Sequence, residues 1–325
     1  MQVGDFVIAM DRTWVKSGLK ATIVTKRDIP SLLVQRVARL RPKPGLNAYF
    51  LSLLIRGHKF EQYVKGVQTE TAVPHISAKQ IKEFPIVLPP IPEQNAISNL
   101  LSIWDAAIEK TERLITSKEK HFSSLIQILI SNRYENWEHL KTQKLFKTVS
   151  EKKNSHEELL SVTQDRGVIP RTMLNGRVMS PKGSTESYKL INKGDFAISL
   201  RSFQGEIEYS EYQGLISPAY TVLRPRLKIH DEFYRHFFKS YLFIEKYLRI
   251  AVIGIRDGKQ ISIPDVMTIK IPYPPMDEQK KIASTLNTAR QEIDLLKKQA
   301  DAFRKQKCGL MQKLLTGQWR VNVAQ

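Results

Sequence analysis

The feature that most constrains the fold is a long apolar stripe that occurs twice. Apolar and small residues alternate at steps of three and four along residues 97–129, and the same spacing returns along residues 282–314. This alternation averages 3.5 residues, which keeps one stripe of an α-helix facing a partner along its length. We therefore expect two long helices that pack on each other antiparallel. The predicted seam residues are Ile97, Leu101, Trp104, Ile108, Ile115, Phe122 and Leu125 in the first helix, and Ile282, Leu286, Ile293, Leu296, Phe303 and Leu310 in the second.

A short proline-led motif precedes each stripe. Pro89-Pro90-Ile91-Pro92-Glu93-Gln94 leads into the first, and Pro274-Pro275-Met276-Asp277-Glu278-Gln279 leads into the second. Proline fits the first turn of a helix, and carboxylates are favoured there by the positive end of the helix dipole. The motif therefore marks the start of both long helices.

The segments before the two helices also repeat. Gly194-Asp195-Phe196-Ala197-Ile198 matches Gly4-Asp5-Phe6-Val7-Ile8, and Gln260-Ile261-Ser262 matches His75-Ile76-Ser77. The chain is thus predicted to hold a mixed globular domain followed by a long helix, twice. The expected boundaries are 1–90 for a partial first globular domain, 91–133 for the first long helix, 134–275 for a complete second globular domain and 276–325 for the second long helix.

The first globular domain is expected to be incomplete at its N-terminus. Only three residues precede Gly4, whereas about sixty, counted from Tyr134, precede the matching Gly194. Hydrophobic periodicity predicts further helices over 48–65, 140–150 and 232–248, with Gly66 ending the first of them. It predicts strands at 4–10, 21–24, 33–40, 84–88, 159–163, 196–200 and 269–273. The fold class is therefore α+β, with two repeated mixed domains and two long antiparallel coiled-coil helices.

The charge favours a polyanionic partner. Lys and Arg number 51 against 32 Asp and Glu, which gives a net charge of +19. A balance this basic favours nucleic acid first and an anionic membrane second, although a basic protein that binds neither stays possible. No apolar run approaches the ~18–20 residues that span a bilayer. Because Cys308 is the single cysteine and the N-terminus has no signal-peptide pattern, we expect a reduced, cytoplasmic protein.

Catalytic motifs are missing from the sequence. It has no Gly-x-Ser-x-Gly elbow, no His-Glu-x-x-His and no Cys/His cluster. Pro264-Asp265 with Ile269-Lys270 resembles a metal-dependent nuclease pattern, but Thr268 stands where that pattern needs an acid. We therefore predict no catalytic residue, no metal ligand and no cofactor bound by this chain.

Candidate DNA contacts lie on polar, basic loops. Lys and Arg contact phosphates, and Arg, Lys, Asn and Gln read base edges. Each of these loops could equally be a solvated turn, and the net charge favours the DNA interpretation. The candidate residues are Arg12, Lys16, Gln164, Arg166, Arg201, Gln204, Arg256, Lys259 and Gln260.

The layout resembles the specificity subunit of type I restriction–modification systems. The resemblance rests on the two Pro-Pro-x-x-Glu-Gln starts, on Leu314-Leu315-Thr316-Gly317 closing the second helix, and on Trp137 with Leu160-Ser161-Val162-Thr163 opening a globular repeat. It implies two target-recognition domains that each read half of a bipartite double-stranded DNA sequence. It also implies that the helices set the gap between half-sites and dock methyltransferase (modification) subunits, expected in two copies, which bind S-adenosylmethionine and methylate adenine. A restriction subunit would join that core, and the specificity subunit would carry no active site.

Two other functions stay open at this stage. The chain could be a coiled-coil scaffold whose basic surface only keeps it soluble. It could also be a decoy that docks on the methyltransferase without reading a full target, because a full family member begins with a complete first recognition domain.

Overall fold

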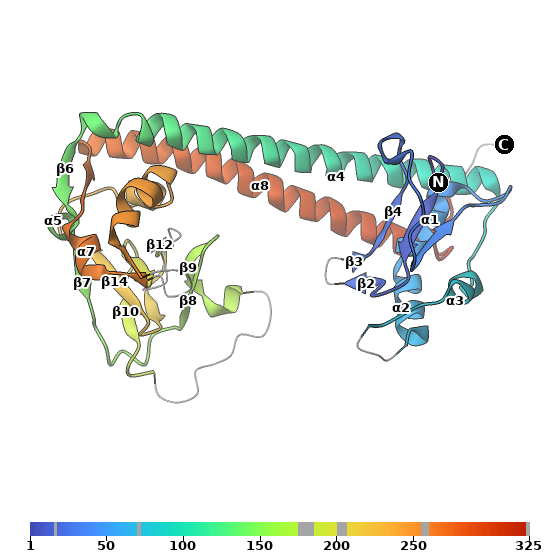
Figure 1. Cartoon of the computed structure of the whole chain (residues 1–325), viewed down its shortest axis with the longest axis horizontal. Helices are drawn as coiled ribbons and strands as arrows, with labels where there is room; N and C mark the ends of the chain where they lie inside the picture. Colours follow the sequence, from blue (N-terminus) through green and yellow to red (C-terminus); the bar gives the residue numbers. More distant parts are fainter. Residues whose placement is uncertain (16–17, 70–72, 175–184, 200–206, 255–259, 323–325) are drawn as a thin grey trace. The chain divides into compact units, whose positions relative to one another are not determined.

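The computed structural model describes residues 1–15, 18–69, 73–174, 185–199, 207–254 and 260–322. It divides into two compact units. The first unit comprises Met1–Ile115 and Leu295–Gln325, and the second comprises Thr116–Asp294. Each unit contains a globular part with helices and strands, and a stretch of both long helices (Figure 1). The predicted α+β class and the repeat of a mixed domain with a long helix are confirmed.

The first unit is built on a three-stranded antiparallel sheet with β1 in the centre, between β4 and β5. A small separate hairpin joins β2 to β3. The helices α1 and α2 supply much of the core beneath the sheet, including the fully buried Phe60 and Val64. The bounds are β1 Phe6–Ala9, β2 Trp14–Val15, β3 Gly18–Leu19, β4 Ala21–Ile23, β5 Val37–Leu40, α1 Ala48–Arg56, α2 His58–Val67 and α3 Ala78–Glu83.

The second unit is built on a four-stranded antiparallel sheet in the order β12-β11-β14-β7. Four two-stranded pairings surround it: β8 with β9, β10 with β13, β15 with β16, and β6 with β17. The bounds are β6 Glu138–Lys141, α5 Thr142–Leu145, β7 Phe146–Val149, β8 Leu160–Thr163, β9 Gly167–Pro170, β10 Lys189–Ile191, β11 Phe196–Ser199, β12 Ile207–Tyr209, β13 Gly214–Ile216, β14 Tyr220–Pro225, α6 Asp231–Phe238, β15 Val252–Ile253, β16 Gln260–Ile261, α7 Ile263–Thr268 and β17 Lys270–Tyr273.

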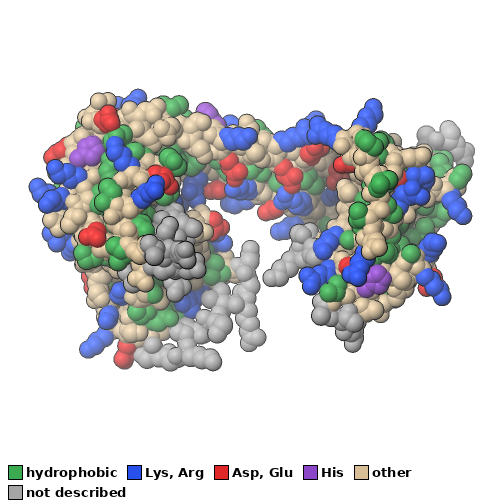
Figure 2. Space-filling view, in the orientation of Figure 1, with side chains coloured by type: hydrophobic (Ala, Val, Ile, Leu, Met, Phe, Trp, Pro, Cys, Tyr) green, Lys and Arg blue, Asp and Glu red, His purple; other side chains and the backbone are tan. Residues whose placement is uncertain are grey.

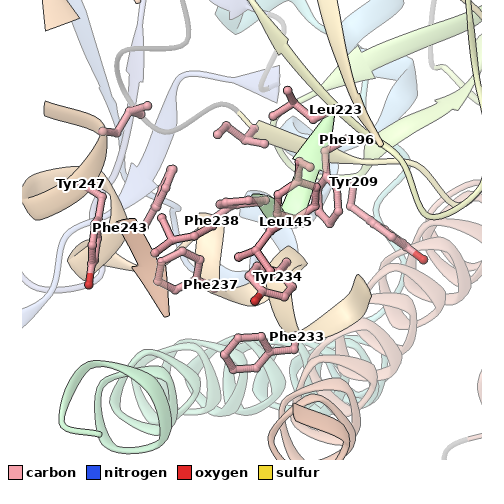
Figure 3. Packing of buried hydrophobic residues seen from close by; sticks show 14 of the residues in the cluster. Leu145, Phe196, Tyr209, Leu223, Phe233, Tyr234, Phe237, Phe238, Phe243 and Tyr247 are labelled. Carbon is pink, nitrogen blue, oxygen red and sulfur yellow. The ribbon is translucent and has the colours of Figure 1, made fainter. Parts of the chain in front are cut away.

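An aromatic cluster forms the core of the second unit (Figure 3). Phe233, Tyr234, Phe237 and Phe238 all come from α6, and all are buried. Tyr234 meets Phe233 and Phe237 edge to face, and Phe238 meets Phe196 of β11 in the same way, the arrangement that aromatic quadrupoles favour. Phe233 lies on the side of the cluster toward the long helices (Figure 3). The core of the globular part and the face of α8 are therefore continuous.

The two long helices are α4 (Ile91–Ile126) and α8 (Met276–Leu314). In each unit a stretch of α4 lies beside a stretch of α8 (Figure 1). Ion pairs join them: Lys307 to Asp105 and Arg304 to Glu112 in the first unit, and Lys118 to Glu292 in the second. The partner numbers on α8 fall as those on α4 rise, so the predicted antiparallel arrangement is confirmed.

Each long helix shows the predicted stripe as a pattern of burial. The predicted seam positions are buried or half-buried, while most of their neighbours along both helices are exposed. Trp104 packs edge to face on Phe303, with ring centroids 5.8 Å apart. The ends of the stripe also serve the globular parts, because Ile97 and Leu101 pack with Phe50 of α1. The stripe therefore packs against a globular part as well as against the other long helix.

The glutamine of the proline-led motif performs the same task in both units. Gln94 Oε1 accepts a hydrogen bond from the backbone N–H of Asn47, the N-cap of α1, and its Nε2 donates to the carbonyl oxygen of Pro89. Gln279 Oε1 accepts from the N–H of His230, the N-cap of α6, and its Nε2 donates to Pro274. Each glutamine therefore fixes the start of a long helix to the first turn of a domain helix.

Replacing Gln279 with Leu is expected to lower the free energy of unfolding by about 2–4 kcal/mol. Gln279 is fully buried, and leucine would leave the N–H of His230 and the carbonyl of Pro274 without their partner. Urea unfolding followed by circular dichroism measures the loss. Lys280→Leu, an exposed neighbour, serves as the control and should change stability by less than about 0.5 kcal/mol. Equal stabilities of the two variants would contradict this role of the glutamine.

A buried aspartate also repeats. Arg41 donates to both carboxylate oxygens of Asp5, and Arg224 donates in the same way to Asp195. Each aspartate follows a glycine with a φ of 91°, a left-handed conformation that glycine adopts without strain. The hydrogen bonds from Arg41 and from the N–H of Gln2 hold the pKa of Asp5 at about 2. These contacts fix the turn that enters an inner strand of each sheet, β1 and β11.

Asp5→Asn is expected to destabilise the protein at pH 7 by about 1–2 kcal/mol, since Arg41 is partly exposed and solvent screens its charge. The folded pKa of Asp5 lies below its unfolded value of 3.8. The stabilisation by the carboxylate is therefore complete above about pH 4 and is lost as the pH falls toward 2. Chemical unfolding at several pH values should show the wild type and the variant converging over that range. A gap that stays constant down to pH 2 would contradict the ionic contribution.

Two predicted helices differ from the structure because of local breaks. The helix expected over 48–65 is two helices, α1 and α2, separated at Gly57, whose backbone is extended. A side chain at Gly57 would meet the carbonyl oxygens of Leu53 and Leu54 at 3.3 and 3.2 Å. The expected stop at Gly66 was wrong, because α2 continues to Val67. The helix expected over 232–248 ends as α6 at Phe238 and resumes as a π-helical turn, Phe243–Tyr247.

Three further predictions were wrong, two of them because the pairing of strands decides the local structure. The helix expected over 140–150 is instead the end of β6, then α5 and β7, since β17 and β14 supply partners for both strands. The strand expected at 84–88 is irregular, because among the described residues no strand pairs with this segment. Its match in the second unit, β17, pairs with β6. The strand expected at 33–40 shortens to β5, which follows Arg36 with a φ of 60°.

Candidate nucleic-acid interface

The turn between β8 and β9 presents two of the predicted DNA contacts. Gln164, Asp165 and Arg166 are all exposed at its tip. The turn closes on Thr163, whose Oγ1 donates to the carbonyl of Gly167 at 2.9 Å and accepts from the N–H of Arg166. Gly167 has a φ of 76°, and a Cβ there would lie 2.6 Å from the carbonyl oxygen of Tyr209. Only glycine therefore lets the turn lie this close to β12.

Two cations hold the same turn from behind. Arg290 of α8 donates to the carbonyl oxygen of Asp165 at 2.8 Å. Lys239, which follows α6, donates to the carbonyl oxygen of Gln164 at 3.2 Å and also pairs with the buried carboxylate of Glu208. Arg166 itself donates to the carbonyl of Met173. The backbone of the turn is thus fixed, while its side chains at 164–166 lie at the surface.

The turn after β1 in the first unit is held in a similar way. Asp11 accepts a hydrogen bond from Arg36 Nη1 at 2.6 Å, and His75 Nδ1 lies 2.6 Å from its other oxygen. These two contacts lower the pKa of Asp11. The N–H of Arg12 donates to the carbonyl of Pro74. This network fixes the backbone that carries Arg12.

Arg12 has a φ of 44°, which is uncommon for a residue with a side chain. Such a conformation costs on the order of 1 kcal/mol and persists where surrounding contacts impose it. Arg12 is exposed, so this strained backbone carries a cation at the surface of a turn that its neighbours hold in place. That is the arrangement expected for a side chain that contacts an external anion.

The positive charge is shared by both units. The first unit contains 23 Lys and Arg against 11 Asp and Glu, a balance of +12, and the second contains 28 against 21, a balance of +7. Lys and Arg side chains are spread over the visible face of each unit (Figure 2). A phosphate backbone would therefore be attracted to either unit.

The other predicted contacts divide into two groups. Gln260 is exposed at the first position of β16, where it pairs with Ile253. Lys16, Arg201, Gln204, Arg256 and Lys259 lie outside the described residues. The structure therefore gives surroundings for Arg12, Gln164, Arg166 and Gln260, and these four stay predictions as DNA contacts.

Sequence reasoning missed the residues that hold the turns. Arg290 stands one position after the half-buried Ala289 and reads as an ordinary exposed charge. Asp11, Arg36 and His75 are far apart in sequence, and only the pairing of β1 with β5 and the bridge between Asp11 and His75 bring them together. One weak signal for Asp11 was present, since this residue immediately precedes the candidate contact Arg12.

The described part of the chain offers neither a cluster of metal ligands nor a membrane-spanning helix. Among the described residues, no group of three or more His, Cys, Asp or Glu is placed to hold a metal ion. Over the same part of the chain, no helix is both long and apolar enough to cross a membrane.

Comparison with known proteins identifies the family. The model of the type I restriction modification DNA specificity domain matches residues 3–117 and 134–302, one match for each repeat. The chain belongs to this family. This specificity subunit is therefore a DNA-recognition component of a type I restriction–modification system.

Individual relatives agree with the family match. Two Methanocaldococcus jannaschii proteins named as specificity subunits of type I restriction enzymes, MjaX and MjaVIII, are 26% and 25% identical to this specificity subunit. The alignments cover 87% and 80% of this chain and 71% and 68% of theirs. The S subunit structure from M. genitalium aligns with a TM-score of 0.55 at 18% identity, over 99% of this chain and 84% of that chain. That likeness shows a shared fold.

Proposed function

We propose that this specificity subunit reads a bipartite double-stranded DNA target, one half-site with each unit, and docks methyltransferase subunits on its helix pair. The observation that carries the proposal is a fixed turn with an exposed arginine in each unit. Hydrogen bonds from behind fix the backbone of the turn at Arg12 in the first unit and of the turn at Gln164 and Arg166 in the second. A fixed backbone supports sequence reading, because side chains that are already in position lose less conformational entropy when they contact base edges.

The chain itself would carry no active site in this proposal. S-adenosylmethionine would bind to the methyltransferase subunits, expected in two copies, and a restriction subunit would join the full complex. The repeat supports two docking positions, since each long helix begins with the same motif and the same glutamine contacts. Phosphate contacts would dominate affinity, so binding should weaken steeply with salt.

The test is a change of methylation motif. The chain is expressed with its methyltransferase subunit in a host without adenine methylation, and modified sites are mapped by sequencing. A bipartite motif that appears only with the chain is the expected result. Arg12→Ala should relax one half of that motif, and Gln164→Ala with Arg166→Ala should relax the other.

Matched controls are available in each unit. Lys65→Ala and Arg249→Ala remove exposed cations that pair with carboxylates one helical turn away, Glu61 and Glu245, rather than with either reading turn. They should leave the motif unchanged. Methylation without sequence preference, or none at all beside a bound methyltransferase subunit, would overturn the reading function and favour the scaffold or the decoy.

A further inference from the structure

The guanidinium of Arg290 is unusually well buried for a cation on one of the long helices. It is half-buried, and its desolvation there lowers the pKa of the side chain. The neighbouring charges are those of Arg235, Asp294, Glu211 and Glu208. Among the described residues no carboxylate forms an ion pair with it, and its hydrogen bond goes to the carbonyl oxygen of Asp165. Burial of this cation is therefore compensated by contact with the turn.

The surroundings of Arg290 connect the turn to the helix pair. Ile293, three residues further on, is buried in the seam, and Glu292 pairs with Lys118 of α4. Asn287 lies three residues earlier. Its Oδ1 accepts a hydrogen bond from Nε2 of His236 in α6, at 2.8 Å. Arg290 thus stands on a part of α8 that is held on several sides.

The geometry points to Arg290 as a positioning residue for DNA reading: we propose that it ties the β8–β9 turn to α8 and so sets how Gln164 and Arg166 meet a base pair. The inference rests on the proposed reading function of that turn. Arg290 and Lys239 hold two successive carbonyl oxygens, of Asp165 and Gln164. With both carbonyls held toward the body of the unit, the orientation of the intervening peptide is fixed.

A positioning role and a phosphate contact predict different binding data. Loss of a phosphate contact weakens binding to all sequences and reduces the slope of log K against log salt by about 0.9. Loss of a positioning contact weakens binding to the cognate half-site and leaves non-specific binding and the salt slope unchanged. The two roles are therefore separable in one titration series.

The experiment uses the complex of the chain with its methyltransferase subunits. The probes are a 30-base-pair duplex carrying the motif mapped by methylation sequencing, and the same duplex with the half-site read by the β8–β9 turn scrambled. Arg290→Met is expected to reduce the ratio of the two affinities about tenfold, at equal salt slope. Arg290→Lys, which can still donate to the carbonyl, should recover part of the ratio. Arg249→Met, the exposed control, should behave as the wild type.

A second measurement follows the turn itself. Trypsin cleaves after arginine, so cleavage after Arg166 in the folded complex reports how often the turn opens. Arg290→Met should accelerate that cleavage several-fold, and Arg249→Met should not. An unchanged affinity ratio with unchanged cleavage, or a uniform loss of affinity with a lower salt slope, would overturn the positioning role. Absence of sequence preference in the wild-type complex would instead overturn the proposed function.

Discussion

Leu286→Asp is expected to abolish the cooperative unfolding transition of the second unit. Leu286 is fully buried, in the same cluster as Phe233 and Ile282. Aspartate would place a charge without a partner in this apolar site. Such a change costs more than about 4 kcal/mol, which is a large fraction of the free energy of unfolding of an ordinary domain. The near-ultraviolet circular dichroism of the aromatic cluster should disappear with it.

The same helix provides a control for this substitution. Leu295 is 65% exposed, so Leu295→Asp introduces the same charge at a solvated position. It should lower stability by less than about 1 kcal/mol. Urea titrations of both variants, followed by near- and far-ultraviolet circular dichroism, separate the two outcomes. Wild-type-like packing of Leu286→Asp would show that the seam does not stabilise the globular core.

Lengthening both long helices by one heptad is expected to lengthen the gap between the two half-sites by about three base pairs. Seven residues add about 10.5 Å to a helix and return its apolar stripe to the same face. The rise of B-DNA is about 3.4 Å per base pair. Suitable positions are after Ile108 in α4 and after Ala300 in α8, because both lie on the stripe within the first unit.

Methylation sequencing measures this outcome directly. The two half-site sequences should stay the same while the number of unspecified bases between them rises. A heptad inserted into α4 alone provides the mismatched variant, which should lose the motif because seam partners no longer meet. An unchanged gap in the double insertion would show that the helices do not set the spacing.

The repeated elements were the most predictable part of this fold. The stripe at 97–129 and 282–314 predicted two antiparallel helices because seam periodicity is a local property of each helix. The Gly-Asp-Phe segments at 4–6 and 194–196 likewise marked the starts of two matching inner strands, β1 and β11. These signals survive in sequence because each one depends on residues close together in the chain.

The errors fell where distant residues decide the local structure. Residues 140–150 have a helical pattern of apolar residues, but two strands from elsewhere in the unit turn most of the segment into β6 and β7. Residues 84–88 show the opposite error. They have the composition of a strand, but no strand among the described residues pairs with them. The candidate site shows the same limit. Gln164 and Arg166 could be proposed from their types, whereas Arg290 and Lys239 required knowledge of which helix lies behind the turn.

The glutamine joint has a consequence for how recognition domains can diverge. Gln94 contacts the N–H of Asn47 and the carbonyl oxygens of Gly45 and Pro89, and Gln279 contacts the N–H of His230 and the carbonyl of Pro274. All of these partners are backbone atoms. The joint therefore demands a particular chain path but almost no particular side chains in the domain that it receives. Genetic exchange between genes at the Pro-Pro-x-x-Glu-Gln motif could bring in a domain with a different target and still form the same junction.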